Sequence, residues 1–273
     1  MTSEQDRIGV RREVYGSGDL SALAVFAGGF INFGYWRDIA PDLTPDAPIT
    51  LEQRVASQQA MYDLVLDALQ VGPGDRVLEV GCGRGIGAAS VLRRDPAQVC
   101  GIDLMPEQVA RAREANPDPR LRFEQGSAAA IPFPDGSFDR LLSVEAAQHF
   151  EDLPGFARES HRVLAPGGRF ALATFFTADE HAAPELARLL DSFATGLDLA
   201  HPIGAVQGAL RAAGFTDVAV ASIGEHVWRY FDRWIAQTEY HDSWGRNWLG
   251  LAERGLVDYY LVTAHKAGAG HEP

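Results

Sequence analysis

The sequence predicts an α/β fold: a doubly wound, mainly parallel sheet of seven strands with helices on both faces. Between residues 76 and 176, short apolar runs alternate with segments that have helical spacing of apolar residues. In addition, a glycine-rich stretch with the letters VLEVGCGRGIG, residues 77–87, joins the first apolar run to a helix-like segment. A strand, a glycine turn and a helix in this order are typical of folds that bind a ligand at the carboxyl edge of a parallel sheet.

The individual elements follow from periodicity and from turn residues. The first 50 residues are irregular, and prolines at positions 41, 45 and 48 indicate a loop. Pro106 at the start of one segment is typical of the first turn of a helix, and the Pro166-Gly167-Gly168 turn ends another. We expect helices over residues 51–70, 86–94, 106–115, 154–164 and 184–213, and strands over residues 76–80, 98–103, 121–126, 138–146, 169–176, 218–223 and 255–267. This order divides the chain into an N-terminal segment (1–50), a ligand-binding core (51–180) and a C-terminal part (181–273) that completes the sheet.

Composition excludes several classes of protein. Of the 273 residues, 46% are hydrophobic and 22% are charged, which is ordinary for a soluble globular chain. No run of 18 apolar residues exists, and the polar start MTSEQDRIGV lacks the apolar centre of a signal peptide, so a cytoplasmic protein without a membrane partner is expected. A net charge of −13 without a basic run argues against a nucleic-acid partner. Cys82 and Cys100 form no CxxC spacing, so we expect neither a metal site nor a disulfide framework.

The glycine stretch has features of two kinds of nucleotide site. Gly81, Gly83 and Gly85 alternate with other residues, and Glu79 stands two positions before the first glycine. The dinucleotide pattern G-x-G-x-x-G survives only as a degenerate match that ends at Ala88. A tight turn without any ligand is the simplest alternative.

Asp103 ends the next predicted strand, about 20 residues after the glycines. An acidic side chain at this place can accept hydrogen bonds from both hydroxyls of a ribose. It can also cap the helix that begins at Pro106. Asp103 alone does not separate a nicotinamide cofactor from another adenosine-containing cofactor.

Several motifs in the right order resemble class I methyltransferases that depend on S-adenosylmethionine (SAM). They are the E-x-G-x-G-x-G run, the segment IPFPDGSFDRLLS (131–143) and the turn RVLAPGGRF (162–170). The resemblance covers roughly residues 60–180 and implies SAM as the cofactor, with no pyrophosphate to hold. One departure is Ser127, where the family often has an acidic residue. The resemblance implies cofactor contacts by Glu79, Gly81, Cys82, Gly83, Asp103, Leu104, Gln108, Ser127, Ala128 and Glu145.

The segment VEAAQHF (144–150) resembles a small-molecule subgroup of bacterial secondary metabolism that includes the rebeccamycin sugar O-methyltransferase. The resemblance implies that His149 points to the methyl donor, where an imidazole can remove a proton from an acceptor hydroxyl. The N-terminal segment with INFGYW (31–36) resembles the subgroup's lid, so Tyr35 is a second catalytic candidate and Tyr15 a substrate contact. The alternatives are a structural histidine and plain packing of Tyr35.

Aromatic residues concentrate in residues 225–250, between the last two predicted strands, where the subgroup builds its acceptor cap. Flat indole and phenol side chains suit an amphipathic acceptor. The alternatives are a small satellite core and a contact in a homodimer. The predicted acceptor contacts are Trp228, His226, Trp234, His241 and Trp244.

Together these observations predict a SAM-dependent methyltransferase that modifies a small natural product, as in antibiotic biosynthesis. A sugar or phenol hydroxyl is the first candidate acceptor, and a carbon or nitrogen atom of an aromatic nucleus such as an indole is the second. An NAD(P)-dependent oxidoreductase and a SAM-binding protein without catalysis are the remaining alternatives.

Overall fold

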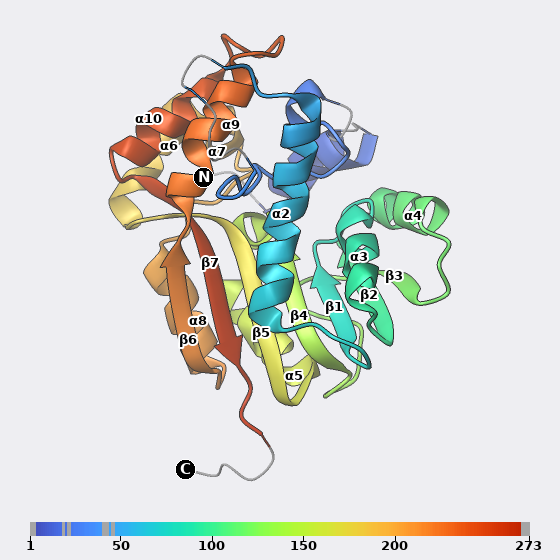
Figure 1. The fold of residues 1–273 in the computed structure, drawn as a ribbon. Helices are drawn as coiled ribbons and strands as arrows, with labels where there is room; N and C mark the ends of the chain where they lie inside the picture. The colour runs from blue at the N-terminus through green and yellow to red at the C-terminus, as the bar shows by residue number, and fades with distance from the viewer. Residues whose placement is uncertain (1–3, 18–19, 21–22, 40–43, 45–46, 269–273) are drawn as a thin grey trace.

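A seven-stranded sheet forms the centre of the molecule, as the sequence predicts (Figure 1). The computed structural model describes residues 4–17, 20, 23–39, 44 and 47–268. The strand order is β3-β2-β1-β4-β5-β7-β6, and β7 runs antiparallel to both of its neighbours while the other pairs are parallel. The strands are β1 (Arg76–Val80), β2 (Gln98–Asp103), β3 (Leu121–Gln125), β4 (Phe138–Val144), β5 (Leu164–Thr177), β6 (Thr216–Ser222) and β7 (Val257–His265).

Helices cover both faces of the sheet. Figure 1 shows α2 crossing the front of the sheet and α5 and α8 behind it. The helices α6, α7, α9 and α10 lie together above the β5, β6 and β7 side of the sheet. Among the described residues, no helix is both long enough and apolar enough to cross a membrane. The longer helices are α1 (Glu4–Arg11), α2 (Leu51–Leu69), α3 (Ile86–Val91), α4 (Pro106–Ala115), α5 (Leu153–Val163), α6 (Ala183–Leu189), α7 (Asp191–Ala194), α8 (Ile203–Ala212), α9 (Trp228–Ile235) and α10 (Asn247–Glu253). A π-helix, η1 (Arg12–Ser17), extends α1, and short 3-10 helices are η3 (Ala24–Phe26), η4 (Leu92–Arg94), η5 (Ala147–His149), η6 (Glu180–Ala182), η7 (Gly224–His226) and η8 (Trp244–Arg246).

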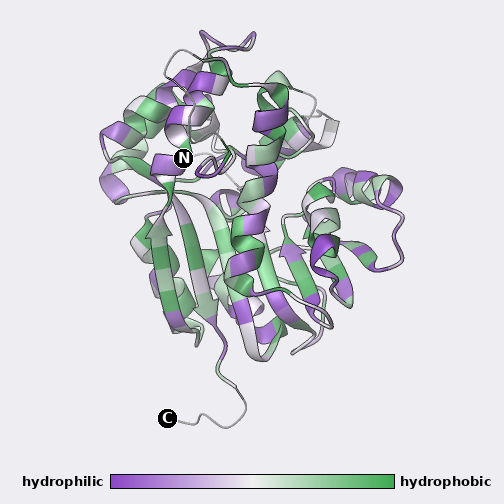
Figure 2. Cartoon of the chain, viewed as in Figure 1, coloured by the Kyte–Doolittle hydropathy of each residue, from purple (hydrophilic) through white to green (hydrophobic). Residues whose placement is uncertain are grey.

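The sheet is buried on both faces because neighbouring residues of each strand serve two separate cores. In β1, Val77 packs into the core under α2, and Leu78 packs into the core under α5 and α8. Both side chains are fully buried. Figure 2 shows the same arrangement as hydrophobic colour along the central strands and alternating colours along the helices. A short strand that is buried along most of its length, as RVLEV is, therefore marks a central parallel strand.

The glycine turn after β1 is tight because two chain segments meet there. Gly81 has a φ of 80°, and a Cβ atom at this position would lie 2.3 Å from the Cβ of Ala146. The backbone N–H groups of Gly81 and Cys82 donate to the carbonyl of Ile102 at the end of β2. Gly83 differs, since a Cβ there would meet nothing within 4 Å. The first glycine thus serves the packing of the turn, whereas the second leaves open space beside the backbone.

Two regions differ from the sequence-based expectations. The single helical region expected over residues 184–213 is divided into α6, α7 and α8. Leu190 is extended between α6 and α7. After α7, Gly196 adopts a left-handed conformation (φ 77°) and Pro202 precedes α8. The intervening segment, residues 195–202, is a loop that returns toward the sheet and pairs Thr177 with Pro202. The N-terminal segment is also less irregular than expected, since α1 and η1 are continuous helical structure.

The aromatic segment of residues 225–250 mainly builds core. Trp228 and Trp248 stack at 5.6 Å and are 5% and 4% exposed. Trp228 also donates its indole N–H to Asp258 at 3.1 Å. Phe33 stacks on Phe231 at 4.0 Å and so joins the N-terminal segment to this core. The helical cap is present, but Trp228, Trp234 and Trp248 are buried in packed protein and do not line the cavity.

Replacement of Trp228 by Phe should lower the free energy of unfolding by about 1–3 kcal/mol, because part of a packed indole and one buried hydrogen bond are lost. Trp244, which is 40% exposed, gives a matched control. Trp244→Phe should change the unfolding free energy by less than about 0.5 kcal/mol. Denaturant melts of the two variants measure the difference, and equal effects would contradict this assignment of the core.

Candidate active site

A cavity of about 290 Å³ opens at the carboxyl edge of the sheet, beside the ends of β1, β2 and β4. Its volume suits one ligand of small-molecule size. Two predicted residues from outside the cofactor set, Tyr15 and His149, also reach it. Of the ten predicted cofactor residues, nine line the cavity: Gly81, Cys82, Gly83, Asp103, Leu104, Gln108, Ser127, Ala128 and Glu145.

Asp103 holds two turns of the cavity wall together. One carboxylate oxygen accepts the N–H of Gly83 at 2.9 Å, and the other accepts the N–H of Met105 at 2.9 Å, just before α4. Burial raises the pKa of Asp103, and these backbone hydrogen bonds lower it. The side chain therefore holds the turn that precedes α4 without capping the helix itself, whose N-cap is Met105, and it also faces the cavity.

Glu79 does not line the cavity, in contrast to the prediction. It is fully buried below the glycine turn, where its Oε1 accepts the hydroxyl of Tyr62 at 2.8 Å. Burial raises the pKa of Glu79 to about 8, and the hydrogen bonds from Tyr62 and the Ala88 backbone offset only part of this. Tyr62 itself reaches the cavity, so Glu79 acts on the site through Tyr62.

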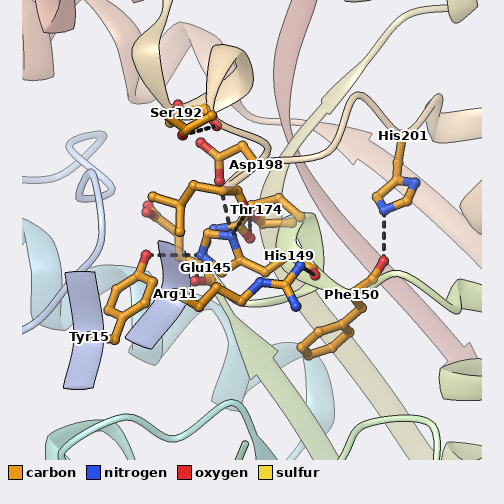
Figure 3. Close-up of polar contacts among 12 residues, drawn as sticks. Arg11, Tyr15, Glu145, His149, Phe150, Thr174, Ser192, Asp198 and His201 are labelled. Atoms are coloured by element: carbon orange, nitrogen blue, oxygen red, sulfur yellow. Dashed lines mark hydrogen bonds and ion pairs between the residues drawn. The ribbon is translucent and has the colours of Figure 1, made fainter. Parts of the chain in front are cut away.

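The Nδ1 side of the His149 ring faces two acceptors. Nδ1 lies 2.9 Å from the carbonyl oxygen of Leu197 and 3.1 Å from a carboxylate oxygen of Asp198, both on the loop between α7 and α8 (Figure 3). Neither acceptor can donate a proton to Nδ1, so Nδ1 carries the hydrogen. The lone pair of the neutral ring is therefore on Nε2.

The Nε2 side faces two donors. The hydroxyl of Tyr15 lies 3.0 Å from Nε2, and the side-chain amide nitrogen of Gln148 lies 3.2 Å from it. A neutral imidazole with hydrogen on Nδ1 has one lone pair, on Nε2, to share between them. The arrangement presents His149 as a proton acceptor at the cavity.

The helical segment α1–η1 covers the cavity and is tied to its rim by charged side chains. Arg7 pairs with Glu151 at 2.8 Å, and Arg11 donates to the carbonyl of His149. Burial is the main cause that lowers the pKa of Arg11. From the other side, Gln108 donates to the carbonyl of Tyr15 at 2.6 Å. These contacts hold Tyr15 over His149.

Glu145 follows β4 in a left-handed conformation (φ 45°), which is costly for a residue with a side chain. Its Oε1 accepts the N–H of Phe33 at 2.5 Å and the hydroxyl of Tyr259 at 2.7 Å. Burial raises its pKa to about 8, although both hydrogen bonds and Arg54 act in the opposite direction. Glu145 thus fastens the N-terminal segment and β7 to the rim of the cavity.

Six predicted site residues lie away from the cavity. Tyr35 is 6% exposed and its ring packs edge-on against His226 at 5.4 Å, so within the segment INFGYW residues 32–36 are buried and only Ile31 reaches the cavity. The aromatic and histidine residues of the C-terminal cap are absorbed by packing or lie at the surface. Besides Glu79, the residues that the structure places outside the lining are Tyr35, Trp228, His226, Trp234, His241 and Trp244.

Sequence reasoning missed Asp198, Arg11 and Tyr62. Asp198 was not predicted because its loop interrupts a stretch with helical spacing of apolar residues. Only Gly196 and Pro202 indicate in the sequence that the helix is interrupted there. Arg11 and Tyr62 occupy ordinary helix positions, and nothing in their local pattern distinguishes them. Their importance depends on long-range packing.

The chain is similar to known methyltransferases. The model of the family described as "Methyltransferase domain" matches residues 78–172. The Erythromycin 3''-O-methyltransferase of Saccharopolyspora erythraea is 30% identical, over 90% of this chain and 86% of the relative. The 27-O-demethylrifamycin SV methyltransferase of Amycolatopsis mediterranei is 30% identical over 72% of this chain and 70% of the relative. Geranyl diphosphate C-methyltransferase from Streptomyces coelicolor A3(2), solved with S-adenosyl-L-homocysteine, shares the fold, with a TM-score of 0.78, 17% identity, and coverage of 98% of this chain and 100% of that chain.

The raised pKa of Glu79 makes stability depend on pH. Between its ordinary pKa of 4.5 and about 8, the folded protein binds a proton at Glu79 that the unfolded chain releases. The contribution of Glu79 to the free energy of unfolding is therefore fully present below about pH 4.5 and is lost as the pH rises toward 8. Compared with Glu79→Gln, the wild-type protein should lose unfolding free energy over this window by at most about 1.4 kcal/mol per pH unit.

Denaturant melts from about pH 5 to about pH 8 measure this difference. Glu145 titrates in a similar range but is present in both proteins, so its contribution cancels. Parallel stability curves for the two proteins would contradict a protonated Glu79.

Proposed function

The chain belongs to the class I SAM-dependent methyltransferases that act on small molecules, and from this premise we propose that it methylates a hydroxyl oxygen of a natural product. The names of relatives that this chain covers over more than two thirds of their length support oxygen as the acceptor atom. Methylation of carbon or nitrogen has less support among these relatives. An NAD(P)-dependent oxidoreductase loses its basis, because its glycine pattern is only degenerate.

The residues around the cavity fit SAM. The open space at Gly83 admits a ligand beside the backbone, and the carboxylate of Asp103 stands at the wall where ribose hydroxyls can donate to it. Leu104, Ser127 and Ala128 offer a small, partly apolar pocket on the same side. When bound, SAM supplies an electrophilic methyl group on a sulfonium ion. The protein's part is to hold the reacting groups together and to receive a proton.

We propose that His149 receives that proton as a general base. The O–H bond of the acceptor would break toward Nε2 while its oxygen bonds to the methyl group, whose bond to the sulfonium sulfur would break and leave a neutral thioether. The charge that develops on the imidazole is stabilised by Asp198, which faces Nδ1–H at 3.1 Å and is 7% exposed. Asp198 thereby acts as a positioning residue for His149. The single observation that carries this proposal is the lone pair of Nε2 at the cavity.

We propose that the acceptor binds at the place that the segment α1–η1 covers in this structure. The cavity of about 290 Å³ is of a size for one ligand, and in this proposal the cover moves to admit the second molecule. The hydroxyl of Tyr15 occupies the position on Nε2 that an acceptor hydroxyl needs. Ile8, Phe30 and Ile31 line the cavity near this cover and suit an amphipathic acceptor.

The remaining proposals concern the setting of the enzyme. We propose that residues 1–50 form its lid, in which residues 4–17 move and residues 30–36 stay fixed by burial. A small molecule is the substrate, and the net charge of −13 supports a partner other than nucleic acid. We propose that the enzyme is cytoplasmic.

Incubation with SAM and a panel of deoxysugar macrolides, phenols and indoles tests the function. Mass spectrometry should show the gain of one methyl group on a hydroxyl compound. His149→Ala should lower kcat by about 10²-fold or more, and Asp198→Asn should lower it by about 10-fold or more, with SAM affinity nearly intact. Methylation of the indoles alone would overturn the choice of oxygen, and tight SAM binding without any product would favour a non-catalytic protein.

Tyr15→Phe tests the position of the acceptor. The variant keeps the ring that packs edge-on against His149 at 5.5 Å and removes only the competing hydroxyl. With the hydroxyl acceptor found in the panel, KM should fall by about 2- to 10-fold while kcat is retained, since one hydrogen bond no longer has to be displaced. A loss of kcat at unchanged KM would instead make Tyr15 part of the proton transfer.

A further inference from the structure

We infer that Gln148 is a positioning residue that keeps Nε2 of His149 available as a proton acceptor. The inference rests on the proposed role of His149 as the base. Gln148 directly precedes His149, is 3% exposed, and contacts groups on both sides of the imidazole ring.

The orientation of the Gln148 amide is set by its buried partners. Its amide nitrogen lies 3.1 Å from the carbonyl oxygen of Glu145, which can only accept. Its amide oxygen accepts the hydroxyl of Thr174 at 2.7 Å, and Thr174 is fully buried in β5. The second N–H of the amide is then left to face Nε2 of His149 at 3.2 Å. A flipped amide would bring two oxygens together at Glu145.

Gln148 also holds the other side of the ring. Its backbone carbonyl accepts the N–H of Leu199 at 3.0 Å. Leu199 follows Asp198 in the loop that supplies both acceptors for Nδ1. The partners of both ring nitrogens therefore depend on one residue.

The amide opposes a positive charge on the imidazole. A protonated ring carries N–H on both nitrogens, so Nε2–H would meet the N–H of Gln148. The other charged or titratable groups near the ring are Asp198 at Nδ1, Tyr15 at Nε2, Arg11 at the His149 carbonyl, and Asp103, whose charge interacts with the ring. Asp198 favours the charged ring, whereas Gln148 favours the neutral one. Before transfer the amide keeps the ring neutral, with its lone pair on Nε2, and after transfer it promotes release of the proton.

Nitrogen NMR of ¹⁵N-histidine-labelled free enzyme near neutral pH tests this role without any acceptor or SAM. The His149 signals are assigned by their loss in His149→Asn. Gln148→Met removes the donor at similar length, and Gln148→Glu places an acceptor there. The ratio of imidazolium to neutral His149 should rise by about 2- to 10-fold in Gln148→Met, as for one lost hydrogen bond, and further in Gln148→Glu.

Ser143→Ala is the matched control, because Ser143 is 1% exposed and its hydroxyl donates to Val80 in the neighbouring strand. This variant loses a buried hydrogen bond and should keep the wild-type ratio. A wild-type ratio in a folded Gln148→Met would overturn the inference, and if that variant does not fold, a wild-type ratio in Gln148→Glu would overturn it. Loss of methyl transfer in His149→Ala is a separate result, so failure of the base and failure of Gln148 are distinguishable.

Discussion

The half-buried carboxyl group of Glu145 makes the contacts on which the active-site region depends. It accepts hydrogen bonds from the N-terminal segment at Phe33 and from β7 at Tyr259, while its backbone carbonyl receives the amide of Gln148. A raised pKa keeps this group largely protonated at neutral pH, so no uncompensated charge is buried. The strained backbone of Glu145 persists because these contacts determine its position from several sides.

The surroundings of His149, the proposed base, come from segments that are distant in the sequence. His149 follows β4, its Nδ1 partners lie on the loop after α7, and its Nε2 partners come from η1 and from its own neighbour Gln148. Because the Leu197 carbonyl and the Asp198 carboxylate only accept and the Gln148 amide nitrogen only donates, the tautomer of the ring follows from hydrogen-bond capacity. Such a network fixes geometry before any ligand arrives, which lowers the cost of organising the site during catalysis.

The cofactor side of the site could be predicted from the sequence, and the acceptor side could not. The strands β1 and β2, the glycine turn and Asp103 depend on local patterns, namely buried apolar runs, left-handed glycines and an acid at a strand end. Asp198 depends on a loop hidden within helical spacing, and this spacing resembles that of a longer helix. An aromatic side chain that packs into a core and one that lines a pocket look alike in sequence, so the sequence could not foresee that the C-terminal tryptophans lie outside the cavity lining. The same holds for Tyr35, whose segment is held by hydrogen bonds to α2 and η7.

The placement of β7 between β5 and β6 has a consequence for the biosynthesis of the protein. All other strands leave the ribosome earlier, yet β6 has no neighbour in the sheet until β7 pairs with it. Tyr259 of β7 is also needed to complete the contacts of Glu145. Until β7 has been synthesised, the nascent chain therefore carries an open edge on β5, where another chain could pair, and lacks one of the contacts of Glu145. A single strand thus completes both the sheet and the rim of the cavity.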